Sequence, residues 1–243
     1  MAAAKDKTDQ VSADEKTQKP NEVRFIEKLN EFVQKNRKNL LLTLAAIVVI
    51  FAGVIIGFTV QEKLQIKAFT TVDAFNERYQ ALREYIGSEE AEAVSKQADI
   101  NALLDDLNGF SAKNSGYAAA RAYSISADIY EAQKKWAESE KAWSAAAKAA
   151  GKSYFAPVSF YNAAVAAEEQ ENIEAAIDHY NRVIEFEKTS FLAARAQFAI
   201  GRLQESRSNK EAALEAYRNL LSKWPGDQLW ANLAQSRIIV LSN

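Results

Sequence analysis

The side chains that most often perform catalysis are scarce in this sequence. His179 is the only histidine and there is no cysteine, so disulfides, thiolate nucleophiles and cysteine-ligated metals are excluded. The acidic pairs Asp105-Asp106 and Glu168-Glu169 are adjacent in sequence, which points their side chains to different sides of a helix. No nucleophile has a base at a suitable spacing, and no glycine-rich phosphate loop occurs. We therefore expect no catalytic residue, no metal site and no cofactor, and we interpret His179 as an exposed helix residue.

A second kind of chemistry, the binding of another polypeptide, needs apolar side chains inside a polar rim. Tyr161, Val165 and Phe198 are predicted to form such an apolar centre, because they follow helical spacing on two helices that stack in one concave face. Arginine and glutamate residues flank them. The alternative is that a terminal helix or the preceding stem of the same chain covers this face. The predicted partner-binding residues are Arg121, Ser124, Asp128, Glu131, Tyr161, Val165, Glu168, Arg195, Phe198, Arg202 and Glu205.

These positions follow from an internal repeat. Aligning residues 117–226 with themselves at a shift of 37 residues superposes small, aromatic and apolar residues. Small residues suit places where two helices cross closely, and an aromatic side chain on the second helix fills the gap beside them. We therefore predict three helical hairpins. The superposed sets are Ala127, Ala164 and Gly201; Ser139, Ala176 and Ala213; Trp143, Tyr180 and Tyr217; and Ala146, Val183 and Leu220.

The spacing resembles that of the tetratricopeptide repeat. In that family's pattern a small residue of the first helix, an alanine and an aromatic residue of the second helix, and a closing proline stand where this chain has Gly201, Ala213, Tyr217 and Pro225. The first two units depart from the pattern, because their period is 37 and they lack the proline. The resemblance implies an all-α fold, in which a tetratricopeptide-repeat-like α-solenoid binds proteins.

Residues 40–60 form an uncharged run of 21 residues. A helix of that length extends about 31 Å, which matches the hydrocarbon core of a bilayer, whereas the apolar part of a signal peptide is shorter. Five basic residues lie in the twenty positions before the run and three in the twenty after it. This asymmetry predicts a single transmembrane helix with a cytoplasmic N-terminus. Gly53 and Gly57 form a G-x-x-x-G pair, which indicates either a helix-packing face or the ordinary glycine content of membrane helices.

The rest of the chain is predicted to form a short N-terminal part and a large C-terminal domain. Residues 1–20 contain few apolar side chains and are predicted to be a disordered cytoplasmic tail. Residues 21–39 have the pattern of an amphipathic helix that lies on the membrane surface or binds a partner. A net charge of −2 does not indicate nucleic-acid binding.

Within the predicted periplasmic domain, residues 61–243, a stem ends at Gly87-Ser88, a second helix covers about 99–112, and Ser190 caps the third repeat. The predicted parts of this domain are a stem and hairpin at 61–113, repeats at about 117–150, 157–187 and 191–224, and a capping helix at 228–241.

The whole layout resembles the YfgM type of bacterial inner-membrane protein, an ancillary subunit of the SecYEG translocon. The stretches VRFIEKLNEFVQKNRKNLL at 23–41 and LAQSRIIVLSN at 233–243 look like that family's pre-anchor segment and closing helix. The resemblance implies a periplasmic repeat domain whose partners are SecYEG, a PpiD-type membrane-anchored chaperone and exported polypeptides. A homo-oligomer is left open. The alternatives are an envelope scaffold, such as a division or Tol-Pal organiser or a cytochrome-assembly factor, and an enzyme, which a metal or cofactor in the purified protein would indicate.

Overall fold

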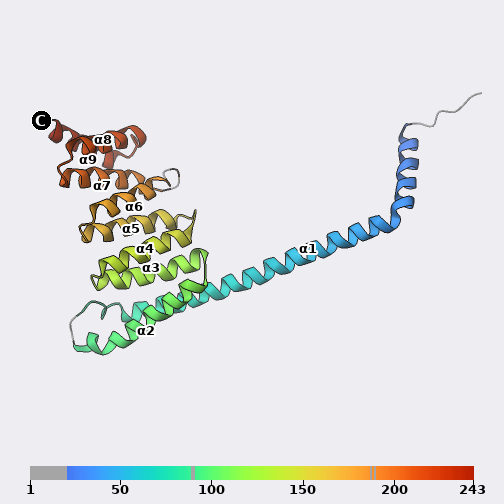
Figure 1. Cartoon of the computed structure of the whole chain (residues 1–243), viewed down its shortest axis with the longest axis horizontal. Coiled ribbons are helices and arrows are strands. Elements are labelled where there is room, and N and C mark those ends of the chain that lie inside the picture. The colour runs from blue at the N-terminus through green and yellow to red at the C-terminus, as the bar shows by residue number, and fades with distance from the viewer. Residues whose placement is uncertain (1–20, 89–90, 187, 189) are drawn as a thin grey trace, which may run out of the picture. The chain divides into compact units, whose positions relative to one another are not determined.

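The computed structural model describes residues 21–88, 91–186, 188 and 190–243. Every regular element among these residues is an α-helix, which confirms the predicted all-α fold class (Figure 1). The predicted disordered tail, residues 1–20, lies outside the described residues. The helices are α1 (Asn21–Leu82), α2 (Ala91–Lys113), α3 (Gly116–Ala132), α4 (Trp136–Ala150), α5 (Phe155–Glu169), α6 (Ile173–Ile184), α7 (Ala193–Ser206), α8 (Lys210–Lys223) and α9 (Gln228–Ser242).

The chain divides into two compact units, Met1–Gln61 and Glu62–Asn243. In the first unit, all described residues belong to α1, and every side chain of residues 40–60 is exposed. The hydroxyls of Thr43 and Thr59 donate to the carbonyls of Asn39 and Ile55, at 2.8 and 2.9 Å, so the polar groups of this run are paired within the helix, as an apolar solvent requires. Among the described residues, α1 is the one helix that is long and apolar enough for a membrane span or a signal anchor.

The second unit begins with a helical pair, formed by residues 62–82 of α1 and by α2. Val72 and Leu82 of α1 share a buried core with Leu103 of α2 and Ile129 of α3. The second helix begins at Ala91 rather than near residue 99, so the predicted start was wrong. The prediction followed the apolar series that begins at Ile100, whereas the preceding turns are made of helix-forming alanine, glutamate and lysine.

Three helical hairpins follow, α3–α4, α5–α6 and α7–α8, and their turns repeat closely. Lys134, Glu171 and Ser208 each adopt a left-handed backbone with φ of 57°, 58° and 59°, and they stand 37 residues apart. In the second and third turns the next residue, an asparagine, caps the following helix. Ser190 does not cap α7. Its hydroxyl accepts the N–H of Leu192 at 3.1 Å, and the helix begins only at Ala193.

The small residues predicted at the hairpin crossings lie where the helices meet. Ala127 and Ala164 are fully buried, as are the aromatic residues Tyr180 and Tyr217. At Gly201, an added Cβ would come within 2.4 Å of the Tyr217 ring. The close crossing of α7 and α8 therefore depends on the absence of a side chain at this position.

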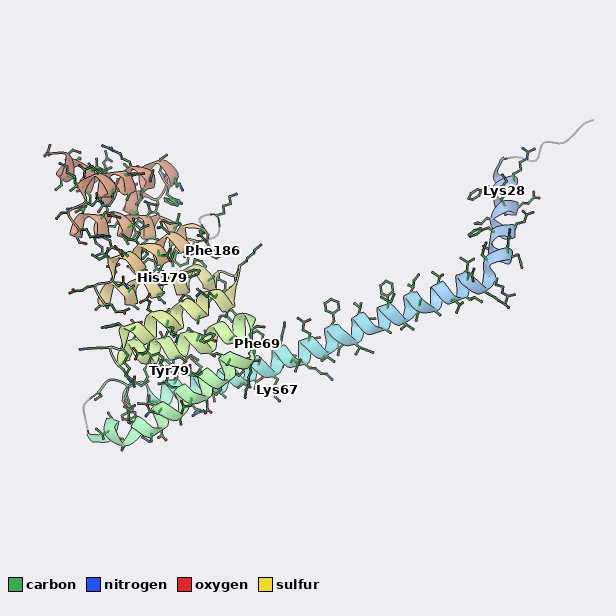
Figure 2. All side chains as sticks on the ribbon, in the orientation of Figure 1. Lys28, Lys67, Phe69, Tyr79, His179 and Phe186 are labelled. Atoms are coloured by element: carbon green, nitrogen blue, oxygen red, sulfur yellow. The ribbon has the colours of Figure 1, made fainter. Side chains whose placement is uncertain are left out.

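The first helices of the hairpins run in the same direction as the stem. At the start of α3, Tyr117 lies against Phe69 of the stem, with ring centroids 6.1 Å apart. At the end of α3, a Cβ on Gly87 would meet the Ala132 carbonyl at 2.1 Å, so only glycine fits at position 87. Figure 2 shows Lys67 and Phe69 at one end of the stem within the second unit and Tyr79 toward the other. We call residues 62–82, α3, α5, α7 and α9 the A helices, and α2, α4, α6 and α8 the B helices.

Candidate interaction face

The predicted partner-binding residues lie on the A helices α3, α5 and α7, and we call this surface the A-helix face. At its centre, the half-buried ring of Tyr161 makes a T-shaped contact with Tyr180, with centroids 5.2 Å apart. The exposed Arg195 of α7 places its guanidinium carbon 4.7 Å from the centroid of the Tyr161 ring. This cation–π contact joins α5 to α7 and leaves an aromatic ring beside a cation at the surface.

A polar contact reinforces the same pair of helices two turns further on. The Tyr180 hydroxyl donates to Glu168 at 2.6 Å, and the Arg202 guanidinium donates to the other carboxylate oxygen of Glu168. Burial, and then the hydrogen bond to Glu168, raises the pKa of the Tyr180 hydroxyl. Glu168 is therefore paired within the chain, with a tyrosine and an arginine from two other helices.

The next pair of A helices repeats this contact. Tyr217 donates to Glu205 at 2.7 Å, and Nε of Arg237, from α9, donates to the same carboxylate at 3.0 Å. The hydrogen bond from Arg237 lowers the pKa of Glu205. Phe198 lies between Tyr217 and Trp230 of α9, with centroid distances of 5.3 and 5.4 Å. The closing helix α9 therefore takes the place beside α7 that α7 takes beside α5.

In the first hairpin, the equivalent glutamate, Glu131, has neither a tyrosine nor an arginine of this kind as a partner within the described part of the chain. Trp143 stands where the other hairpins have Tyr180 and Tyr217, and its indole Nε1 is buried without a hydrogen-bond partner among the described residues. Glu131 is consequently exposed. One turn earlier, burial and the charge of Glu131 raise the pKa of Asp128 to about 6, against the opposing charges of Arg121 and Arg83. This end of the face is thus an incompletely neutralised acidic cluster.

Replacing Asp128 with asparagine is expected to stabilise the second unit near neutral pH. A folded-state pKa of about 6, above the unfolded value, means that the folded protein binds more protons between about pH 4 and 6, so stability falls as pH rises through that window. Asp128→Asn should therefore add about 2 kcal/mol to the unfolding free energy above pH 6, and nothing below pH 4. Thermal unfolding of the full chain in detergent, followed by circular dichroism at both pH values, measures this. Asp105→Asn, at an exposed site of α2, is the control, and a lower stability of Asp128→Asn near neutrality would contradict the prediction.

The structure brings the predicted residues together on α5 and α7 and less so on α3. Ser124 is only 6% exposed, and its hydroxyl donates to the carbonyl of Arg121 in its own helix, so it offers little to a partner. Val165 and Phe198 are half-buried and Arg202 is exposed. At Gly53 and Gly57 an added Cβ would meet no atom within 4 Å beyond the adjacent residues and the local helix backbone, and the pairing of this helix with another stays a prediction.

Four residues of the face were missed by the reading of the sequence. Tyr180 and Tyr217 were predicted as packing residues only, although their hydroxyls bind the glutamates of the face. Arg237 and Trp230 were assigned only to a capping helix. Their equivalents on α7 stand 35 residues earlier, at Arg202 and Arg195, so an alignment at a shift of 37 does not superpose them. An alignment with a variable shift would have shown Arg237.

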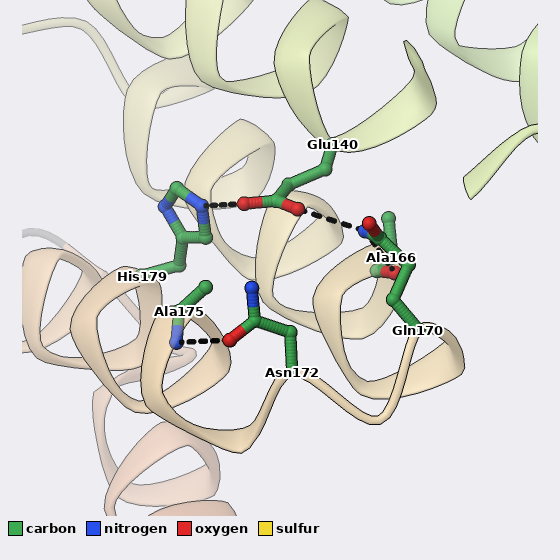
Figure 3. Close-up of polar contacts among 6 residues, drawn as sticks. All are labelled: Glu140, Ala166, Gln170, Asn172, Ala175 and His179. Atoms are coloured by element: carbon green, nitrogen blue, oxygen red, sulfur yellow. Dashed lines mark hydrogen bonds and ion pairs between the residues drawn. The ribbon is translucent and has the colours of Figure 1, made fainter. Parts of the chain in front are cut away.

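His179 is not an exposed helix residue, and the prediction that it is exposed was wrong. Its side chain is 12% exposed, and Nε2 lies 3.0 Å from Glu140 of α4. Glu140 also accepts from the side-chain amide of Gln170 at 2.8 Å, and the imidazole stacks on Phe160. Figure 3 shows this polar cluster, which joins α4, α6 and the end of α5. The members of this cluster link three segments of the second unit through hydrogen bonds.

Two comparisons with known proteins agree with this geometry. Residues 195–227 match the family model of the tetratricopeptide repeat, which covers most of α7, all of α8 and the turn after them. A region of 93 residues is 37% identical to a TPR repeat-containing protein of Treponema pallidum (strain Nichols). The match covers 38% of this chain and 38% of that protein's length. The second unit is therefore a tetratricopeptide-repeat-like α-solenoid, a fold that implies a role in binding proteins.

Proposed function

We propose that this chain is a non-enzymatic, membrane-anchored interaction subunit of the YfgM type, which associates with the SecYEG translocon and a PpiD-type chaperone. In this proposal residues 40–60 span the bacterial inner membrane, the N-terminus is cytoplasmic, and the second unit lies in the periplasm. The exported polypeptides are its clients. The observation that carries the proposal is the pairing of Arg195 with Tyr161 at the surface of a tetratricopeptide-repeat-like domain, because aromatic rings and arginines are the residues most enriched where proteins bind.

The internal pairing of the glutamates on the A-helix face supports clients of varied sequence. Glu168 and Glu205 are each bonded to a tyrosine and an arginine of the chain itself, so they are not available to select a basic residue of a client. The rings of Tyr161 and Phe198, with Arg195, remain as contact points. Contacts of this kind depend on apolar area rather than on a particular hydrogen-bond pattern, and they suit a partner of low selectivity.

The membrane anchor would make weak binding useful. A tether near the channel exit raises the effective concentration of the face for emerging chains without any new contact. Few apolar anchors give rapid dissociation, so a client would be held briefly and passed to the chaperone. This mechanism needs no catalytic group.

Photo-cross-linking from Arg195 tests the proposal directly. A photoreactive side chain at this exposed position of the full-length protein, in cells, is expected to capture exported polypeptides, and mild-detergent purification should retain SecYEG and the chaperone. Tyr161→Ala with Phe198→Ala should lower client capture several-fold with an unchanged helical circular dichroism signal, because both rings leave the A-helix face. A partner set without the translocon would contradict the proposal and favour an envelope scaffold.

A matched pair of charge reversals separates binding from stability. Arg195→Glu changes the face without removing a core side chain, since Arg195 is exposed. Arg218→Glu makes the same change at an exposed position of the B helix α8. For these two variants the photoreactive side chain replaces Asn162, next to Tyr161, because Arg195 is itself changed. Client capture should fall for Arg195→Glu only. Equal capture by both would show that the A-helix face is not the client site.

A further inference from the structure

Aromatic side chains stand at the start of successive A helices. Tyr117, Tyr154 and Phe191 are spaced 37 residues apart, and Phe69 holds the corresponding place on the stem. Phe69, Tyr154 and Phe191 are 40%, 66% and 81% exposed. We call these four residues the aromatic edge. The repeat family's small and aromatic positions lie elsewhere, within the hairpins, so the repeat fold itself does not require them.

Three members of the aromatic edge form a continuous surface. The Tyr117 ring lies 6.1 Å from Phe69 and 6.5 Å from Tyr154, measured between centroids. The hydroxyls of the two tyrosines are 3.2 Å apart. Figure 1 shows the connections α2–α3 and α4–α5 and the start of α7 at the same end of the stacked helices. Exposed aromatic rings in contact across three elements mark an interaction surface rather than scattered apolar residues.

The charge around the aromatic edge differs from that of the domain. Residues 61–243 carry 21 basic and 25 acidic side chains, a net charge of −4. The segments 62–69, 113–117 and 148–155, which contain or adjoin the first three aromatic residues, carry five lysines and one acid, Glu62. The segment before Phe191 differs, because it contains the acidic residues Glu185 and Glu187. The lysines are Lys63, Lys67, Lys113, Lys148 and Lys152, and all are exposed.

The position of Phe69 in the chain identifies the surface that these residues meet. Phe69 follows Val60, the last residue of the apolar run, by nine residues, which is at most about 32 Å of extended chain. Gly87, at the opposite edge of the domain, follows it by 27 residues. Along the chain, the aromatic edge therefore begins 18 residues closer to residues 40–60 than the opposite edge does.

We propose that the aromatic edge binds the surface of the lipid bilayer that holds the anchor. Tyrosine rings favour the headgroup level, because one end is apolar and the other is polar, and the lysines beside them attract anionic lipid. This proposal rests on the anchoring by residues 40–60 in the proposed function. Its consequence is that the repeat domain does not swing freely on its tether. The A-helix face is held at a constant height above the bilayer, where emerging chains pass.

The absence of cysteine allows a direct test with single-cysteine variants of the full-length chain. Tyr154→Cys, Phe191→Cys and Ser208→Cys, all at exposed positions, each receive an environment-sensitive fluorophore. The proteins are reconstituted in vesicles of phosphatidylethanolamine and phosphatidylglycerol that contain a headgroup-level spin-labelled lipid. Quenching at position 154 is expected to be several-fold greater than at 208, which lies in an α7–α8 turn at the other edge, and position 191 should be intermediate. Vesicles of phosphatidylcholine alone, or Lys113→Glu with Lys152→Glu, should reduce quenching at 154.

The outcomes distinguish this proposal from the proposed function. Equal quenching at 154 and 208 overturns lipid binding. Shielding of 154 in native membranes but not in the vesicles also overturns it, and assigns the aromatic edge to a protein partner. Flotation of the chain with vesicles after alkaline carbonate treatment tests the anchor separately. A chain that floats and retains the translocon, but shows no quenching at 154, contradicts only the lipid contact of the aromatic edge.

Discussion

Replacing Tyr180 with alanine is expected to lower the unfolding free energy by about 3–5 kcal/mol, the range found when a buried aromatic side chain is removed. Tyr180 is only 1% exposed and lies in the core shared by α5, α6 and α7. Its ring supports Tyr161, and its hydroxyl orients Glu168. Since a whole domain is stable by about 5–15 kcal/mol, one substitution would remove a large part of its stability. Urea unfolding of the full chain in detergent, followed by circular dichroism, measures the loss.

Two further variants show which part of Tyr180 matters. Tyr180→Phe keeps the ring and removes one hydrogen bond, and it should cost about 1 kcal/mol, because Arg202 continues to neutralise Glu168. Tyr154→Ala removes an exposed ring of the same kind and should cost less than about 1 kcal/mol, as surface substitutions do. A Tyr180→Phe variant as unstable as Tyr180→Ala would show that the hydroxyl contact, and not ring packing, holds the hairpin together.

The consequence for binding follows from the same contacts. Tyr161 keeps its place on the A-helix face because Tyr180 packs beneath it and Arg195 lies over it. The ring that we propose to contact clients is therefore fixed by a core residue of the B helix. A client-binding defect in Tyr180→Ala would reflect the loss of this support, and Arg195→Glu is the better probe of the face itself.

The repeat could be predicted from the sequence because packing restricts the size of particular residues. Ala164 and Ala213 are fully buried, a Cβ on Gly201 would clash with Tyr217, and the aromatic residues beside them recur at the same interval. Size restrictions of this kind leave a periodic trace. The exposed run at 40–60 was equally visible, since its apolar character depends on composition alone.

The polar contacts of the face left no such trace. Glu168 was predicted to face a partner, whereas it binds Tyr180 and Arg202 of the chain itself, which are 12 and 34 residues away. His179 was interpreted as an exposed helix residue, whereas its partner, Glu140, lies 39 residues earlier on another helix. Hydrogen-bond partners on different helices depend on how the hairpins stack. The arginine that binds the glutamate of the face does recur, at Arg202 and Arg237, but 35 residues apart, so an alignment at a shift of 37 does not superpose the two.

The close crossing at Gly201 leads to a prediction that runs against helix propensity. Alanine is favoured over glycine inside a helix by about 1 kcal/mol, so propensity alone predicts that Gly201→Ala stabilises α7. Its Cβ would, however, lie 2.4 Å from a ring atom of Tyr217, which is fully buried and hydrogen-bonded to Glu205. The ring has little room to move, so we expect a net destabilisation of about 1–3 kcal/mol, typical of an overpacked core. Thermal unfolding of the full chain in detergent measures the shift.

Gly109 of α2 provides the matched control, because it is an exposed helical glycine with no atom within 4 Å of a built Cβ. Gly109→Ala should stabilise the protein by about 0.5–1 kcal/mol through helix propensity alone. The same substitution is thus expected to have opposite signs at two positions of one protein. Stabilisation by Gly201→Ala would mean that α7 and α8 do not cross as closely as described, and that Tyr217 is not fixed by Glu205. The contact of Arg237 with the same carboxylate would then lose its structural basis, together with the place of α9 beside α7.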